Sequence, residues 1–149
     1  MHKPMDLPYV GQTLPFTCAA ACFESMYQFL RGASPGELHW ASELGTMSLG
    51  YTPPVNVYLL GVSLGFTCRI SESAGWGDLL SAVNSAAVIF VTWWDEDARH
   101  YSLLKGIDEC SVILMDPLTA FERRDNILDK DFFLEQWKAR GSVMIHFEM

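Results

Sequence analysis

Apolar residues recur at helical spacing near the start of the chain. In the segment 18–30, CAAACFESMYQFL, the side chains of Cys22, Met26 and Leu30 share one face. Spacing of this kind is typical of an amphipathic helix with one buried face. Gly32 follows as a helix stop, so the pattern predicts a helix over 18–30.

Three further helices are predicted before residue 86. Ser34-Pro35-Gly36-Glu37 has the form of a capping box with proline at the first helical position. Thr52-Pro53-Pro54 opens the next helix, and Asp78 places a negative charge in the first turn of the third, where the helix dipole favours it. We expect these helices to run through Leu44, from 52 through Leu64, and from 76 to 85.

The second half of the chain has the character of β-structure. The segment 87–93 is apolar and β-branched, which favours a buried strand. Asp108-Glu109 suits the tight connection of a hairpin, and Asp129 is placed to cap a later helix that ends at Gly141. Strands are expected at 66–70, 87–93, 100–107, 111–115 and 143–147. Helices followed by antiparallel strands predict an α+β fold.

The composition narrows the classes of function. The 149 residues suit one domain, 1–149, and half of them are apolar, which is enough for a packed core. The net charge of −8 and an isoelectric point of about 4.8 argue against nucleic-acid partners and against docking on an anionic membrane. No apolar run approaches the ~20 residues of a membrane helix. The first residues, MHKPMD, lack the apolar core of a secretory signal, so we expect no signal peptide and a cytoplasmic location.

One of four cysteines stands in a position that favours reactivity. Cys18, Cys22, Cys68 and Cys110 could form two disulfides, but a chain of this length does not need them, and we expect reduced thiols. Cys18 lies where a loop rich in turn residues becomes a helix. The unpaired N–H groups and the dipole of a first helical turn favour the thiolate, which is the nucleophilic form. Burial as a small apolar residue is the alternative, and it is our interpretation for the other three.

Metal binding is a second alternative for this segment. Cys18 and Cys22 lie one helical turn apart, a spacing that permits joint coordination of a metal with a histidine. The sequence contains no second pair of ligands at the spacing of a zinc site. We therefore expect no metal.

A histidine and an aspartate bracket the predicted hairpin. His100 opens one strand after the polar segment 95–99, and Asp116 follows the next strand, just before Pro117. Antiparallel pairing about 108–109 brings the two to the same open end. There the carboxylate could bind one imidazole nitrogen and leave the other for a thiol. Each residue alone has a simpler explanation, as a surface histidine and as a turn aspartate.

A glutamine precedes the cysteine at a distance that suits an oxyanion hole. Gln12 lies six residues before Cys18. Its side-chain amide, together with the backbone N–H of Cys18 at the helix start, could hold a developing oxyanion. Taken alone, Gln12 is an ordinary loop residue. The four residues indicate a catalytic site only together, in the order Gln, Cys, His and Asp along the chain.

In this order the chain resembles the papain-like cysteine peptidases that remove double-glycine leaders from bacteriocins. That family has a glutamine six residues before its nucleophilic cysteine, as in the run from Gln12 to Cys18. Its histidine begins an apolar strand, as His100 does here, and its aspartate stands in an Asp-Pro pair, as in Asp116-Pro117. Further matches lie at Gly50, the helix through Leu64, Gly65-Phe66, Phe133 and Trp137, so the resemblance covers roughly residues 8 to 148.

The resemblance implies a papain-like fold and a stand-alone peptidase that hydrolyses amides through a thioester acyl-enzyme, without a metal or cofactor. Cys18 would be the nucleophile, and His100 would act first as general base and then as acid. Asp116 would orient His100, while Gln12 and the Cys18 N–H would form the oxyanion hole. The substrate would be a protein or peptide that is cut after small residues, in particular Gly-Gly.

One departure from the family bears on specificity. The family usually has glycine after the nucleophile, and here the residue is Ala19, whose methyl group could narrow the cleft. A cleft that selects glycine must exclude larger side chains, and the large residues expected to wall it are Trp93, Trp94 and Tyr51.

Two biological roles fit the resemblance. One is leader removal during peptide export or maturation. The other is a protease toxin delivered into the cytoplasm of rival bacteria, for which the producer would need an inhibitor or immunity protein. Two alternatives of other classes are a non-catalytic peptide-binding module and a Cys-His-Asp acyltransferase, which uses the same residues but passes the acyl group to an amine.

Overall fold

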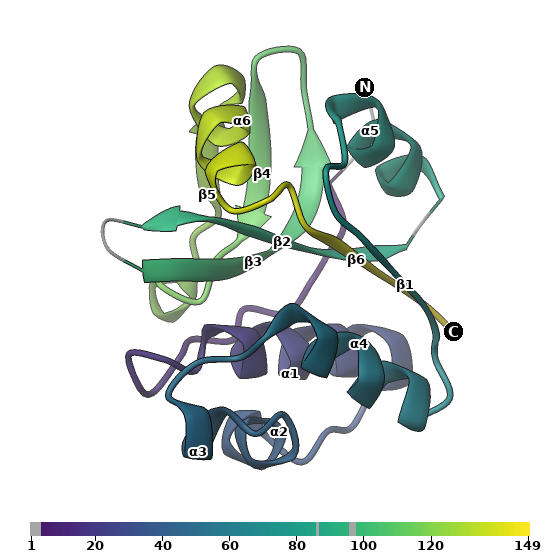
Figure 1. Cartoon of the computed structure of the whole chain (residues 1–149), viewed down its shortest axis with the longest axis vertical. Coiled ribbons are helices and arrows are strands. Elements are labelled where there is room, and N and C mark those ends of the chain that lie inside the picture. The colour runs from purple at the N-terminus through teal and green to yellow at the C-terminus, as the bar shows by residue number, and fades with distance from the viewer. Residues whose placement is uncertain (1–3, 86, 96–97) are drawn as a thin grey trace.

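The computed structural model describes residues 4–85, 87–95 and 98–149. Helices dominate the first half of the chain and strands the second (Figure 1). The elements are α1 Cys18–Arg31, α2 Glu37–Glu43, α3 Thr46–Leu49, α4 Pro54–Ser63, β1 Thr67–Ser71, α5 Trp76–Asn84, β2 Val88–Asp95, β3 Ala98–Ile107, β4 Ser111–Met115, the 3-10 helix η1 Ala120–Glu122, β5 Asn126–Asp129, α6 Lys130–Ala139 and β6 Met144–Glu148.

Helix α1 forms where the apolar spacing predicts it. It begins at Cys18, and Gly32 follows its last residue with a φ of 88°, a positive value that glycine adopts readily. The ring of Phe23 lies 6.3 Å from that of Phe90 and 5.9 Å from that of Phe147, which anchors the helix on the sheet. The N-terminal half of α1, which carries Cys18, is therefore held in the core.

The six strands form one antiparallel sheet in the order β1-β6-β2-β3-β4-β5. Trp93 of β2 lies opposite His100 of β3, and Leu103 of β3 lies opposite Met115 of β4. The predicted tight hairpin is present, with the turn 108–111 closed by a backbone hydrogen bond of 3.0 Å. This register brings the beginning of β3 and the end of β4 to the same end of the hairpin.

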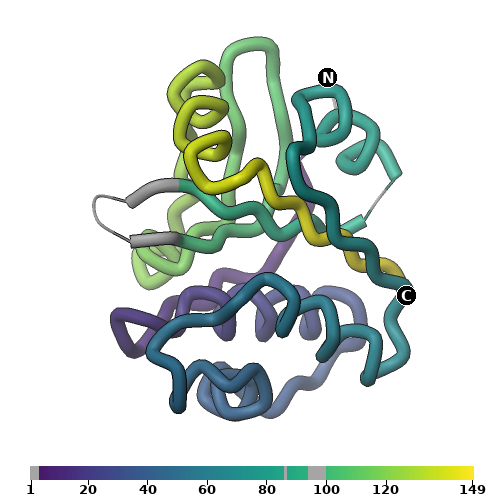
Figure 2. The backbone as a smooth tube through the Cα atoms, viewed as in Figure 1, coloured from purple at the N-terminus to yellow at the C-terminus, as the bar shows by residue number. Residues whose placement is uncertain are grey.

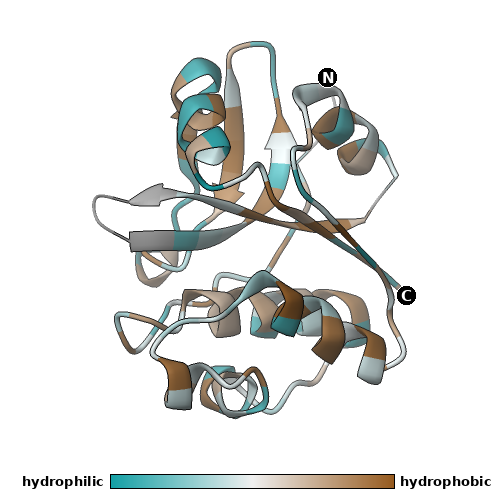
Figure 3. Cartoon of the chain, in the orientation of Figure 1, coloured by the Kyte–Doolittle hydropathy of each residue, from teal (hydrophilic) through white to brown (hydrophobic). Residues whose placement is uncertain are grey.

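The sheet lies between two layers of helices (Figure 1). Helices α1 to α4 cover one face and helices α5 and α6 cover the other. Each layer buries its own core against the sheet, and Figure 3 shows the central strands in the hydrophobic colour between the two layers. The α+β prediction is confirmed, with helices on both faces of one antiparallel sheet.

The capping box predicted for 34–37 does not form. Helix α2 begins at Glu37 itself, after Gly36 with a φ of 110°. Ser34 donates a hydrogen bond of 2.6 Å to the buried carboxylate of Glu24 in α1, and Glu37 accepts hydrogen bonds from the loop before α1. The prediction was wrong because both polar side chains join α1 to α2 instead of capping a helix end.

The pattern of apolar residues in the sequence did not predict several short elements. Helix α3 has four residues between two glycines, and β5 adds a four-residue edge strand that pairs Asn126 with Leu114 of β4. Strands β2 and β3 also reach Asp95 and Ala98, so the predicted polar segment 95–99 is mostly strand, and its residues 96 and 97 lie outside the described residues. Such elements are stabilised by their neighbours more than by their own sequence.

The N-terminal segment crosses the back of the sheet before it enters the loop that leads to α1 (Figure 2). The N–H of Met5 donates a 2.9 Å hydrogen bond to the carbonyl of Lys105 in β3. Residues 1–3 lie outside the described residues. Within the described part of the chain, no helix combines the length and apolar character needed to cross a membrane.

Candidate active site

Cys18 lies at the N-terminus of α1, in the wall of a pocket of about 440 Å³. Only 7% of the residue is exposed. One wall of the pocket comes from the loop before α1 and the other from the loop before α4 and from β3. The lining residues are Pro15, Phe16, Cys18, Gly50, Tyr51, Thr52 and Tyr101. The hydroxyl of Tyr101 donates a 2.7 Å hydrogen bond to the carbonyl of Thr52, which fixes the two parts of the second wall, β3 and the loop before α4, to each other.

His100 and Asp116 meet at the open end of the β3–β4 hairpin. Nε2 of His100 lies 2.5 Å from Oδ1 of Asp116, and both residues are buried. The side chain of Cys18 lies near enough to the imidazole to raise its pKa. Since Nε2 faces the carboxylate, Nδ1 is the nitrogen left for the thiol. The structure therefore joins three of the four residues singled out in the sequence into one chain of contacts.

The pKa values of His100 and Asp116 are shifted in opposite directions. Burial by itself would lower the pKa of His100, but the hydrogen bonds with Asp116 and Cys18 outweigh it and raise the pKa from 6.5 to about 10. Burial by itself would raise the pKa of Asp116, but the hydrogen bond from His100 and the positive charge of its ring hold that pKa below its usual value. At neutral pH the pair is an imidazolium beside a carboxylate.

Asp116 is held on both of its oxygens. Asn126 of β5 donates a 2.7 Å hydrogen bond to Oδ2, and the backbone N–H of Leu118 donates a 3.0 Å hydrogen bond to Oδ1. Sequence reasoning missed Asn126, because β5 was not predicted and an asparagine in a polar segment gives no local signal. These donors satisfy a carboxylate that would otherwise be costly to bury.

Trp93 does not wall the pocket as predicted. It is 5% exposed, its ring stands edge-on to His100 with centroids 5.3 Å apart, and its Nε1 donates a 2.9 Å hydrogen bond to Ser102. The reason is the strand face, because Trp93 belongs to the core between the sheet and helices α5 and α6, whereas Cys18 belongs to the core on the other face. Tyr51 does line the pocket, whereas the side chain of Trp94 lies outside the described residues.

Ala19 also differs from the expectation. The residue is 1% exposed and belongs to the core between α1 and the sheet. It is not among the residues that line the pocket beside Cys18. Its methyl group therefore fills core space, and the predicted narrowing of the cleft was wrong.

Gln12 lies in the loop before α1, and its amide is already engaged. Nε2 donates hydrogen bonds of 3.0 Å to the carbonyl of Leu14 and 3.1 Å to that of Pro15. Its Oε1 is buried with no hydrogen-bond partner among the described residues. The backbone N–H of Gln12 donates to the carbonyl of Pro117 at 3.4 Å, so the residue also joins the loop before α1 to the loop after Asp116.

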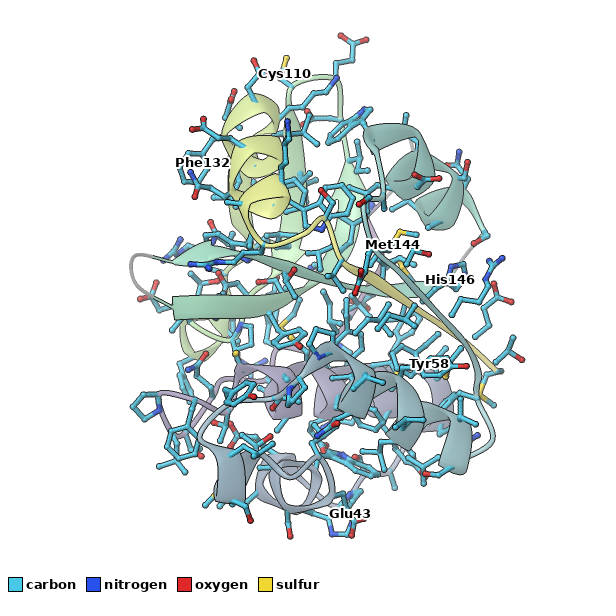
Figure 4. All side chains as sticks on the ribbon, in the orientation of Figure 1. Glu43, Tyr58, Cys110, Phe132, Met144 and His146 are labelled. Atoms are coloured by element: carbon cyan, nitrogen blue, oxygen red, sulfur yellow. The ribbon has the colours of Figure 1, made fainter. Side chains whose placement is uncertain are left out.

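The remaining cysteines lie in different environments. Cys22 is fully buried, and burial raises its pKa well above the usual value, while Cys68 is half-buried with a pKa raised to about 11. Cys110 is exposed at the turn between β3 and β4, far from α1 (Figure 4). The expectation that Cys110 is a core residue was wrong, because the turn carries it away from both core layers.

Within 4–85, 87–95 and 98–149, no group of three His, Cys, Asp or Glu side chains could hold a metal ion.

The arrangement has the parts needed for nucleophilic catalysis. A thiol at a helix N-terminus faces a protonated imidazole, a carboxylate holds the far side of that imidazole, and the thiol opens onto a pocket. Such a group can form and break a covalent bond to an acyl carbon.

Comparisons with known proteins agree with this geometry. Residues 6–147 match the profile of the Peptidase C39 family. A protein from Bacillus anthracis described as a C39-like peptidase superposes with a TM-score of 0.77 at 16% identity, covering 100% of this chain and 98% of the other.

Two further solved structures give a TM-score of 0.72. The peptidase domain of Streptococcus ComA, a bifunctional ABC transporter involved in quorum sensing, is 16% identical, with 99% of this chain and 100% of that chain covered. A double-glycine-motif protease from an AMS/PCAT transporter, in complex with a leader peptide, is 13% identical, with coverages of 100% and 96%. No curated protein matches the chain. At these identities the structural likeness establishes the shared fold.

Proposed function

The chain belongs to the Peptidase C39 family and is a cysteine peptidase, and we propose that it cuts peptides after Gly-Gly with Cys18, His100 and Asp116 as its catalytic group. The observation that carries this assignment is the position of His100, whose Nε2 is bound to Asp116 and whose pKa is raised by the neighbouring side chain of Cys18. The pocket beside Cys18 gives a substrate access to the thiol.

In the proposed reaction, His100 holds the proton given up by the Cys18 thiol, and the resulting thiolate Sγ attacks the carbonyl carbon of the scissile amide. His100 carries a proton at neutral pH, since its pKa is raised to about 10, and it delivers this proton to the departing amine. A thioester joins Cys18 to the N-terminal part of the substrate. His100 then takes a proton from a water molecule, which attacks the thioester and releases the new carboxyl terminus.

The oxyanion that develops in each step would be held by the N–H of Cys18 and the amide of Gln12. The first N–H groups of α1 have no acceptor within the helix, and no side chain caps them. The Gln12 amide is bonded to the carbonyls of Leu14 and Pro15, so its role requires that the oxyanion replace one of these acceptors. Both carbonyls belong to the same turn, so the side chain can give up one of these bonds and keep the other while it donates to the oxyanion.

The pocket supports a preference for residues without side chains. Rings from both walls border it, those of Phe16, Tyr51 and Tyr101. Walls of this size would accept an extended glycine backbone and clash with a Cβ substituent, and the hydrogen bond between Tyr101 and Thr52 holds the wall opposite Phe16 in place. Selection for Gly-Gly would then come from the exclusion of larger residues.

Of the two roles that the sequence leaves open, we propose leader removal from a precursor peptide. The solved double-glycine-motif protease bound to a leader peptide supports this choice. No feature of the described residues favours a toxin role or identifies an inhibitor partner.

A peptide assay tests the proposed function. The protein is incubated with a peptide that contains one Gly-Gly pair and with a matched peptide that has Ala-Ala instead, and the fragments are weighed by mass spectrometry. We expect a cut after Gly-Gly with the addition of one water, slower cutting of the Ala-Ala peptide by more than the ~10-fold to 200-fold of a forgiving pocket, and no cut by Cys18→Ala. Equal rates on both peptides would contradict the specificity, and transfer to an added amine without hydrolysis would indicate an acyltransferase.

A further inference from the structure

We propose that Glu37 is a positioning residue that holds the turn before Cys18 in its catalytic shape. Glu37 is the first residue of α2, it is buried, and it does not line the pocket. The inference rests on the proposed function, which makes Cys18 the nucleophile. It adds Glu37 to the site, where the order of Gln, Cys, His and Asp in the sequence had not placed it.

The carboxylate of Glu37 accepts three hydrogen bonds from the loop before α1. The backbone N–H of Thr13 donates to Oε2 at 2.8 Å, and its hydroxyl donates to Oε1 at 2.6 Å. The hydroxyl of Thr17, the residue before Cys18, donates to Oε2 at 2.8 Å. Both ends of the five-residue turn 13–17 are therefore fixed to one side chain of another helix.

These bonds also satisfy a charge that has no cation beside it. No lysine, arginine or histidine among the described residues forms an ion pair with Glu37. A buried carboxylate in this position is stabilised by its donors alone, and hydrogen bonds to a carboxylate are among the stronger ones in proteins. The turn and the carboxylate are thus strongly dependent on each other.

Thr17 shows what the arrangement does to α1. Threonine at the N-cap of a helix normally turns its hydroxyl to an N–H of the first turn. Here Thr17 occupies the N-cap, and its side chain makes no capping hydrogen bond, because the hydroxyl donates to Glu37 and its oxygen accepts from the N–H of Leu14 within the turn at 3.2 Å. The first N–H groups of α1 consequently keep no side-chain acceptor and stay available for the substrate oxyanion.

The same turn carries the other candidate oxyanion donor. Gln12 precedes Thr13, and its amide is bonded to the carbonyls of Leu14 and Pro15 within the turn. A displacement of the turn would therefore move Gln12 and the N-terminus of α1 together. We infer that loss of the Glu37 carboxylate lowers the rate of the chemical step, while substrate contacts on the far wall of the pocket remain.

Glu24 provides a matched control. It is also a buried carboxylate that joins α1 to α2, and it accepts hydrogen bonds from Ser34 at 2.6 Å, from the N–H of Gly36 at 2.7 Å and from Nε1 of Trp40 at 3.0 Å. None of these donors lies in the turn before Cys18. Glu24→Gln thus disturbs the same pair of helices without touching the turn.

The test compares Glu37→Gln with Glu24→Gln in a Cys110→Ser background, which removes the exposed thiol. A glutamine at position 37 has only one side-chain oxygen. It can therefore accept hydrogen bonds at only one of the two oxygen positions to which Thr13 and Thr17 donate. We expect kcat to fall ~10-fold to 100-fold in Glu37→Gln with KM changed little, as for a catalytic group moved by a fraction of an ångström. Glu24→Gln should lower the melting temperature and leave kcat per folded molecule unchanged.

A second set of variants separates positioning from stability. Thr17→Val removes the hydroxyl and should resemble Glu37→Gln, whereas Thr17→Ser keeps it and should restore most of the rate. The double variant Glu37→Gln/Thr17→Val should be no slower than either single variant, because the two residues act through one contact. Additive losses, or equal kcat values in the Glu37 and Glu24 variants, would overturn the proposal.

The rate of Cys18 alkylation by iodoacetamide gives a readout that needs no substrate. We expect Glu37→Gln to change this rate and its pH profile, and Glu24→Gln to leave both at the values of the parent protein. If the parent protein cuts no Gly-Gly peptide, the proposed function fails, while the alkylation comparison still decides whether Glu37 shapes the site. An alkylation profile unchanged in Glu37→Gln would refute its role.

Discussion

Asn126 donates a hydrogen bond of 2.7 Å to Oδ2 of Asp116, while Oδ1 of the same carboxylate lies 2.5 Å from the imidazole of His100. The contact connects the edge strand β5 to the proposed catalytic group. It fixes the rotation of the Asp116 carboxylate and thereby the angle at which Oδ1 meets His100.

Replacement of Asn126 by leucine should affect both stability and rate. It leaves Oδ2 of Asp116 buried without its side-chain donor, which costs about 1–3 kcal/mol of unfolding free energy. We expect kcat to fall ~10-fold as well, because His100 loses part of its orientation. Urea unfolding and the peptide assay measure the two effects.

The matched control is Asn56→Leu, which removes a 2.9 Å hydrogen bond from Asn56 to the carbonyl of Leu44. This bond lies among the helices and does not reach His100 or Asp116. Asn56→Leu should lower stability and leave kcat per folded molecule unchanged. If the Asn126 variant also kept its kcat, the carboxylate would not depend on Asn126 for its orientation.

The pH dependence of stability follows from the raised pKa of His100. The folded protein holds the imidazole proton up to a pH of about 10, whereas the unfolded chain releases it near 6.5. The stabilisation is therefore complete below 6.5 and is lost as the pH rises through 10. On the acid side, the lowered pKa of Asp116 means that its contribution is lost as the pH falls below the usual range of a carboxyl group.

Urea unfolding of the parent protein and His100→Gln at about pH 6, 8 and 10 tests this relation. We expect the parent to be more stable at pH 6 and the difference to shrink steadily toward pH 10. A difference that stays constant over this range would show that the imidazole is not held as the cation.

Selective alkylation should identify Cys18 among the thiols. In a Cys110→Ser protein, limiting iodoacetamide at neutral pH should label Cys18 first, because Cys18 borders the pocket at the start of α1, beside the imidazole of His100. Burial keeps Cys22 and Cys68 in their thiol forms, since it raises the pKa of both. Peptide mapping locates the label, and preferential labelling of Cys22 or Cys68 would remove Cys18 from its proposed role.

Gln12→Ala should slow turnover by ~10²–10³-fold, the usual cost of one lost oxyanion donor. The measurement is kcat on a Gly-Gly peptide, with binding of the uncleaved peptide to Cys18→Ala compared in the presence and absence of the Gln12 change. We expect binding to be unaffected, because the oxyanion exists only during the reaction. Full activity in Gln12→Ala would leave its amide with only the structural hydrogen bonds to Leu14 and Pro15.

The parts of the site that the sequence predicts are those governed by short-range rules. The position of Cys18 follows from a helical repeat that begins after turn residues and ends at Gly32. The meeting of His100 and Asp116 at one end of the hairpin follows from its tight turn. Counting outward from the pair Leu103–Met115 places Asp116 opposite Ser102, two residues along β3 from His100 and on the same face, so the two side chains meet diagonally.

The missed parts depend on contacts between distant segments. Asn126 and Glu37 are polar residues in short elements, and only the packing of β5 on β4 and of α2 on α1 brings them to the site. Trp93 was misplaced because an apolar strand with two buried faces gives no alternation from which to tell them apart. Side-chain hydrogen bonds across the fold leave no periodic trace in the sequence.

The central claim is that peptide cleavage proceeds through a thioester on Cys18. Its most direct test mixes the protein with a Gly-Gly peptide that bears a fluorescent amine leaving group, quenches the reaction in acid within milliseconds, and weighs the intact protein and its fragments. We predict a burst of one leaving group per folded molecule and an added mass equal to the acyl part of the peptide, located on Cys18. Cleavage that leaves no acyl mass on the protein, or that persists in Cys18→Ala, would contradict the account.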